Sequence, residues 1–265
     1  MRSCCILAIV LFWGANAAAA QRGVHLRIGK DDATIDKVKP YLGIVDSVSV
    51  YGGADDSFLA FCRRNGIKVW LASDLAIDDL RTLAMTMAAQ DRVCNYCRGA
   101  GTPSSGLYFD VVEHFCREGI YDGVELGFHD FGRTWLDKFL GFSRSIAQHL
   151  RLHMSPRGAV VLRVPFQSAP HVADALADTV PIKQAAYLSI SDAAAGKSCS
   201  AREGVPEFWR RQAASPWKTM LELEDGGLLD CLRTARAIDA QMVSIADISN
   251  VSEQDRLALK SWRKQ

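Results

Sequence analysis

The chain has 265 residues, of which 49% are hydrophobic and 23% are charged, and its formal net charge at pH 7 is +1. This length fits one large domain or two small ones, and we find no repeat, low-complexity stretch or linker that divides the chain. The near-zero charge excludes the basic surface with which proteins hold nucleic acids, so no nucleic-acid partner is expected.

The first 20 residues have the pattern of a secretory signal peptide. Arg2 supplies a positive charge, an apolar run extends from Cys4 to Trp13, and small residues follow up to Ala20. The run covers only about ten residues, whereas a membrane-spanning helix needs roughly 20. We expect cleavage after Ala20, the alternative being an uncleaved anchor. The mature domain, residues 21–265, is then secreted, outside the cell or in the lumen of the secretory pathway, with no membrane partner.

Short apolar runs alternate with longer helical patterns along the whole mature chain. Such alternation predicts a parallel sheet with outer helices, and eight strands over about 240 residues match a closed barrel. The expected fold class is therefore α/β, a single (β/α)8 TIM-type barrel. The predicted strands are 24–28, 47–51, 68–73, 123–128, 159–164, 186–190, 219–223 and 242–246, and the predicted helices are 55–64, 77–89, 109–117, 134–152, 170–176, 227–238 and 252–262.

Several predicted strands alternate polar with apolar residues. His25 and Arg27, for example, alternate with three aliphatic residues in 24–28. Because successive side chains of a strand point to opposite faces, the apolar set should face the helices and the polar set the barrel axis. Charges on that axis must be paired or hydrated, which leaves open a structural ion network or a ligand site. The residues that could supply both signs there are Arg27, Arg163, Glu125, Glu222 and Glu224.

Six of the eight cysteines remain once the two in the signal segment, Cys4 and Cys5, are removed. An even number in a secreted chain indicates disulfides. Cys94 and Cys97 form a single CxxC pair without the second half of a zinc site, so no metal and no cofactor is expected. The predicted disulfides are Cys62–Cys116, Cys199–Cys231 and Cys94–Cys97.

A glycosylation sequon, Asn250-Val251-Ser252, lies near the C-terminus of the chain. An N-linked glycan at Asn250 would place this loop on the surface of a secreted protein.

The most informative stretch is 122–129, Asp-Gly-Val-Glu-Leu-Gly-Phe-His, on the fourth predicted strand. It resembles the signature of glycoside hydrolase family 18, the chitinases, whose pattern is Asp-Gly-x-Asp-x-Asp-x-Glu. Segments 46–52, 56–62 and 65–74 resemble the chitobiase branch of that family. The resemblance implies a barrel fold, and an N-acetylglucosamine-containing glycan or a secreted protein as partner.

In that family the last Glu of the signature protonates the leaving oxygen, and the central Asp orients the acetamido group of the substrate, which attacks the anomeric carbon. Compared position by position, Asp122 keeps the first Asp and Glu125 replaces the second. Gly127 stands in place of the central Asp, and His129 in place of the acid. The resemblance therefore implies that the proton donor and the orienting carboxylate are missing.

Two further family positions also differ in this chain. The Tyr-Asp pair after the sixth strand falls at Ser191-Asp192, and the Trp of the eighth strand falls near Ser244 or Ile245. We assign no catalytic residue with the family's role, and we expect a catalytically inactive protein.

The C-terminal ends of barrel strands carry the functional residues of most barrel enzymes. An Asp in such a place can instead cap the following helix, whereas His129 has no capping role. Tyr51 and Trp70 could stack on sugar rings or belong to the core, and for Trp70 we expect the core. The candidate ligand-binding residues are Tyr51, Asp74, His129, Asp130, Asp192 and Glu224.

Three functions are compatible with these features. We favour a non-catalytic, chitinase-like protein that binds a carbohydrate or a protein at the barrel mouth. The second is an active glycoside hydrolase with an altered site that uses His129 with Glu125 or Asp130, since a His can act as general acid near neutral pH. The third is a scaffold whose mouth is closed by the region around residues 94–97.

Overall fold

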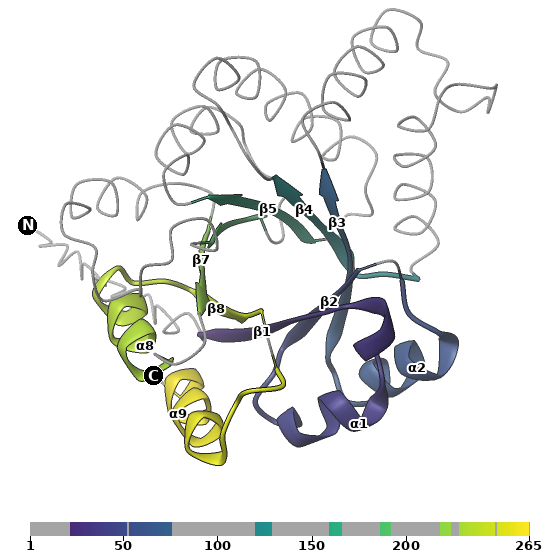
Figure 1. Ribbon diagram of the computed structural model, residues 1–265, viewed down its shortest axis with the longest axis horizontal. Helices are drawn as coiled ribbons and strands as arrows, with labels where there is room; N and C mark the ends of the chain where they lie inside the picture. Colours follow the sequence, from purple (N-terminus) through teal and green to yellow (C-terminus); the bar gives the residue numbers. More distant parts are fainter. Residues whose placement is uncertain are drawn as a thin grey trace, which may run out of the picture.

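A closed barrel of eight parallel strands forms the centre of the molecule (Figure 1). The computed structural model describes residues 22–51, 53–75, 120–128, 159–165, 186–191, 218–223, 228–246 and 248–264. Neighbouring strands pair in chain order, and β8 pairs with β1 to close the sheet. The strands are β1 (Gly23–Ile28), β2 (Ser47–Tyr51), β3 (Lys68–Leu75), β4 (Gly123–Phe128), β5 (Ala159–Pro165), β6 (Ala186–Ser191), β7 (Lys218–Leu223) and β8 (Met242–Ile245). The predicted α/β class and the parallel barrel are confirmed.

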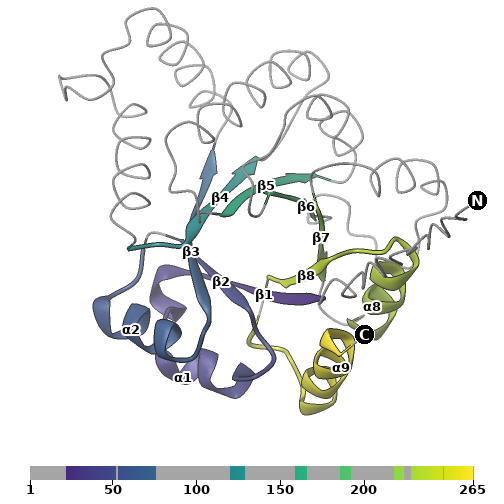
Figure 2. The ribbon, with the colours of Figure 1, turned by 180° about the vertical axis from the view of Figure 1, so that it is seen from behind.

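Helices of the described ranges lie outside the barrel, as both views show (Figures 1 and 2). The predictions for 55–64, 227–238 and 252–262 are confirmed, and the remaining predicted helices lie outside the described residues. The sequence pattern did not predict the short turns between β1 and β2, since one turn is too short to leave an apolar period. The helices are η1 (Lys30–Asp32), α1 (Ile35–Val38), η2 (Lys39–Tyr41), α2 (Asp56–Arg64), α8 (Leu228–Ala237) and α9 (Glu253–Arg263).

Local capping sets where two of these helices begin. The Asp55 carboxylate accepts the Phe58 amide at 2.7 Å, and this bond is the main cause of the lowered pKa of Asp55. At α9, Ser252 and Asp255 form a reciprocal capping box. Among the described residues, no helix has the length and apolar character needed to cross a membrane.

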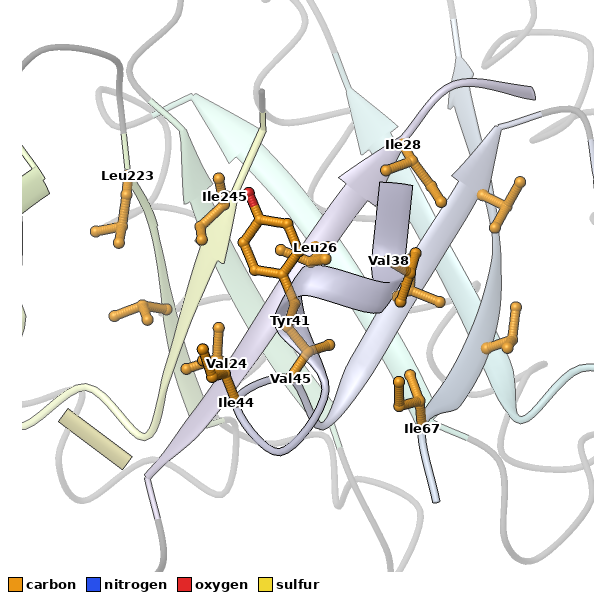
Figure 3. Packing of buried hydrophobic residues seen from close by; sticks show 14 of the residues in the cluster. Val24, Leu26, Ile28, Val38, Tyr41, Ile44, Val45, Ile67, Leu223 and Ile245 are labelled. Atoms are coloured by element: carbon orange, nitrogen blue, oxygen red, sulfur yellow. The ribbon is translucent and has the colours of Figure 1, made fainter. Parts of the chain in front are cut away.

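The main hydrophobic core lies between the strands and the outer helices. Val24, Leu26 and Ile28 of β1 point outward and pack near Val38 and Tyr41 of the segment that follows (Figure 3). All five side chains are at most 3% exposed, so the alternation of β1 places its apolar half in this layer. The predicted orientation of the apolar set is confirmed.

A second, smaller cluster is built from the opposite faces of four strands. Because these residues alternate with the outward-facing set, they fill the barrel axis. Trp70 is only 1% exposed, which confirms that it belongs to the core. The cluster comprises Trp70, Ala159, Val161, Met220 and Met242.

Helix α9 ties the end of the described chain to its beginning. The Trp262 indole donates to the Gly23 carbonyl at 3.2 Å, and Arg263 forms an ion pair with Asp46 at 2.6 Å. Asp46 in turn accepts the Val24 amide at 3.0 Å. These bonds attach the start of β1 to α9. Because β1 pairs with β8, they also stabilise the closure of the barrel.

The predicted Cys62–Cys116 disulfide is wrong, because the Cys62 thiol is free in the structure. Cys62 lies on the apolar face of α2 beside Phe58 and Leu59 and is fully buried, so the core uses it as a small apolar residue. Burial, with a smaller effect of Asp122, raises the pKa of this thiol to about 12. The thiol is therefore protonated and unreactive at neutral pH.

The other predicted disulfides involve residues outside the described ranges. Cys231 on α8 is disulfide-bonded, and its predicted partner, Cys199, lies outside these ranges. The pairings Cys199–Cys231 and Cys94–Cys97 stay predictions.

Gly123 at the start of β4 is expected to tolerate no side chain. A Cβ there would lie 2.4 Å from the Ala159 carbonyl oxygen and 2.8 Å from its amide nitrogen, both backbone atoms of β5. We expect Gly123→Ala to destabilise the fold by roughly 1–3 kcal/mol, the usual cost of overpacking. Urea unfolding measures this. The control is Gly29→Ala, where a Cβ has no neighbour within 4 Å. Equal stability of the two variants would show that β4 and β5 can separate without cost.

Candidate functional site

The barrel interior beyond the apolar cluster is polar, as the alternation of the strands predicts. Its side chains come from β1, β2, β4, β5, β7 and β8, and none is more than 7% exposed. A set of this kind must satisfy its charges and hydrogen bonds internally. Its members are His25, Arg27, Ser47, Ser49, Glu125, Arg163, Glu222 and Ser244.

Glu125 of β4 lies at the centre of one half of this network. Its Oε1 atom is 2.7 Å from Nε of Arg27, and its Oε2 atom accepts the Ser49 hydroxyl and lies 3.3 Å from Nε2 of His25. Burial alone would raise the pKa of Glu125, but the Arg27 charge and the bonds from His25 and Ser49 outweigh it and lower the pKa to about 2. The carboxylate is therefore ionised at every physiological pH.

The hydrogen bonds of Ser49 and Ser47 determine which ring nitrogen of His25 carries the proton. Ser49 donates its single proton to Glu125, so its oxygen accepts from Nε2 of His25, 2.8 Å away, and Glu125 Oε2 shares this one N–H at the longer distance of 3.3 Å. Nδ1 then accepts from the Ser47 hydroxyl at 2.9 Å. Burial is the largest influence on the pKa of His25 and lowers it from the ordinary 6.5, against the opposing effect of Glu125. The ring is neutral and stacks on Trp70, with centroids 4.5 Å apart.

The other half of the network is a two-point ion pair between β5 and β7. Nε and Nη2 of Arg163 lie 2.8 Å and 3.0 Å from the two carboxylate oxygens of Glu222. Nη1 of Arg27 lies 3.2 Å from Oε1 of Glu222, so Arg27 joins the two halves. Two guanidinium groups thus balance two carboxylates. The sequence left open whether these charges form a structural ion network or a ligand site. The geometry favours the structural ion network.

The described signature positions have separate roles in the structure. Asp122 precedes β4, and its carboxylate accepts the Val69 amide of β3 at 2.9 Å, so it ties two strands together. Glu125 points into the interior network. Gly127 is paired in the sheet with Asp74 on one side and Arg163 on the other.

Tyr51 is the candidate ligand residue whose side chain the structure describes. It ends β2, is partly exposed, accepts a hydrogen bond from Arg27, and has its ring 5.3 Å from the Arg27 guanidinium carbon. The backbone of Asp74 lies on β3 opposite Gly127. Asn250 lies on an exposed turn, as a glycosylation site requires. The candidates outside the described residues are His129, Asp130, Asp192 and Glu224.

The sequence pattern predicted that His25 and Glu125 face the barrel axis, but it did not predict the contact between them. No local pattern could have done so, because His25 and Glu125 are 100 positions apart. Among the described residues, no group of His, Cys, Asp and Glu side chains could hold a metal ion.

Comparison with known proteins finds structures with a similar fold. No family model and no curated protein matches the sequence. Among solved structures, the chain is similar to the C-terminal domain of a putative chitinase from Desulfitobacterium hafniense, with 12% identity and a TM-score of 0.56 over 92% of this chain and 99% of that one. It is also similar to a chitinase from Bacteroides thetaiotaomicron, with 10% identity and a TM-score of 0.53 over 90% and 93% of the two chains.

A malate synthase from Haloferax volcanii is similar too, at 8% identity and a TM-score of 0.52 over 92% of this chain and 74% of that one. Barrels with different chemistries therefore share this architecture, and at such identities the likeness shows the fold alone. What these comparisons show is a barrel fold that chitinases and a malate synthase have in common.

Proposed function

We propose that this chain is a secreted, chitinase-like protein that binds an N-acetylglucosamine-containing glycan at the C-terminal mouth of its barrel without cleaving it. The N-terminal pattern of a signal peptide supports secretion, and the chitinase-like fold supports a glycan as ligand. Barrels of this type carry their binding sites at the C-terminal ends of the strands.

The observation that supports a lack of hydrolysis is the state of Glu125. A general acid must hold a proton at the working pH and reach the substrate. Glu125 is fully buried, its pKa is lowered to about 2, and its oxygens are bound by Arg27, His25 and Ser49. Asp122 is engaged with the backbone of β3. Neither signature carboxylate is therefore available as proton donor.

Tyr51 supports a ligand site at the mouth. It lies at the C-terminal end of β2, is partly exposed, and has the Arg27 guanidinium beside it. An aromatic ring in this place can stack on a sugar ring, and the adjacent guanidinium holds the phenol in place.

The test combines binding and turnover on the purified mature chain. We expect retention on chitin resin, measurable heat on titration with N-acetylglucosamine oligomers, and no product from a fluorogenic chitooligosaccharide. Tyr51→Ala should weaken binding by about two- to tenfold, the effect of one lost aromatic contact. The matched control is Ser261→Ala, an exposed residue of α9.

The possible outcomes separate the three functions considered from the sequence. Absence of binding to any N-acetylglucosamine polymer would count against a glycan ligand and favour a protein partner or a scaffold. Turnover would contradict the inactive protein, and turnover that disappears in His129→Ala would establish the altered hydrolase.

A further inference from the structure

In the part of the barrel that the structure describes, the Ser244 hydroxyl has no hydrogen-bond partner in the protein. The Ser244 side chain on β8 is fully buried, and its hydroxyl oxygen makes no hydrogen bond to any described residue. A serine hydroxyl left unsatisfied in a protein interior lowers the folding equilibrium constant by roughly 5- to 150-fold. Native interiors rarely retain such a cost, and they remove it with a bound water when other polar groups are near.

Polar side chains lie next to Ser244 at the same level of the barrel, meaning the set of residues paired across the strands at the height of Ser244. In the sheet register Ser244 is the direct partner of His25 on β1 and of Glu222 on β7, and both of these side chains also face the axis. A carboxylate oxygen can accept more than one hydrogen bond, and a hydroxyl can both donate and accept. The hydroxyl therefore faces polar neighbours on both adjacent strands.

The same level is enclosed on two sides along the axis. One step toward the N-terminal ends of the strands lie Met220 and Met242, members of the apolar cluster. One step toward the C-terminal ends lies Arg27, which bridges Glu125 and Glu222. A molecule held beside Ser244 would be small, polar and shielded from bulk solvent.

We propose that the barrel interior binds one ordered water molecule at the Ser244 hydroxyl, as a permanent member of the polar network. This water exchanges a hydrogen bond with Ser244 and donates one to the Glu222 carboxylate on β7, the paired strand. The inference is independent of glycan binding, because it concerns a level below the mouth of the barrel.

A high-resolution crystal structure of the mature chain tests the proposal directly. We expect density for one water within hydrogen-bond distance of Ser244 Oγ, and its loss in Ser244→Ala. Density for a heavier ion, empty density, or a direct bond from Ser244 to another side chain would overturn the proposal.

The sign of a stability change provides a second, independent test. If the water is present, Ser244→Ala removes one of its partners, and the folding equilibrium constant should fall by about five- to tenfold in urea unfolding. If the hydroxyl is unsatisfied, the same substitution should raise this constant. Ser261→Ala, an exposed serine-to-alanine change on α9, should leave it unchanged. If Ser244→Ala does not fold, the electron density beside Ser244 in the wild-type crystal decides by itself whether the water is present.

Discussion

Glu125→Ala is expected to destabilise the folded protein by about 3–5 kcal/mol, because it leaves a buried charge without its partner. The Arg27 guanidinium is 6% exposed and lies 2.7 Å from the Glu125 carboxylate. Without that carboxylate, the only charged partner described for Arg27 is Glu222, which Arg163 already occupies with two bonds; the contact with the neutral Tyr51 phenol does not replace the lost charge. A loss of this size is a large part of the roughly 5–15 kcal/mol by which domains are stable.

Urea unfolding at pH 7.5 measures the loss, with two variants as controls. Glu125→Gln keeps the size of the side chain and an acceptor for Ser49, so it should cost less than Glu125→Ala while still destabilising. Asp32→Ala breaks an exposed ion pair with Lys37 and should change stability by no more than about 0.5 kcal/mol. If Glu125→Ala were as stable as Asp32→Ala, the network would contribute nothing to the fold.

Stability is expected to fall in acid in two successive pH ranges, one for each titrating group of the network. The pKa of His25 is lowered by burial from 6.5, so below pH 6.5 the unfolded chain binds more protons than the folded chain. This contribution is complete above pH 6.5 and is lost as the pH falls below it. The pKa of Glu125 is lowered from 4.5 to about 2, which contributes about 3 kcal/mol above pH 4.5. That contribution is lost as the pH falls from 4.5 toward 2.

Unfolding free energies measured from pH 8 to pH 3 check both ranges. In Glu125→Gln the slope below pH 4.5 should decrease, because a group that titrates only in the unfolded chain has been removed. In His25→Gln the slope just below pH 6.5 should decrease in the same way. Comparing slopes instead of absolute stabilities separates titration from the direct damage of each substitution. Wild-type slopes retained in both variants would show that other groups control the acid response.

The sequence by itself determined the class of the fold and which side chains of each strand face the barrel axis or the helices. Each predicted strand overlaps an observed one, with ends that agree to within two residues. The orientation of His25 and Glu125 toward the axis follows from the two-residue period of a strand. These are local properties, and neighbouring residues of the chain suffice to determine them. The Trp70 core position follows in the same way.

Only the tertiary structure decided which interior groups meet. From the sequence, either arginine could have paired with Glu125, and the closed barrel places Arg27 there and Arg163 against Glu222. The same holds for Cys62, which the sequence pattern predicted in a disulfide and the packing of α2 buries as a free thiol. The physical reason is that such contacts join strands far apart in the chain. They depend on sheet order and register, which no local pattern contains.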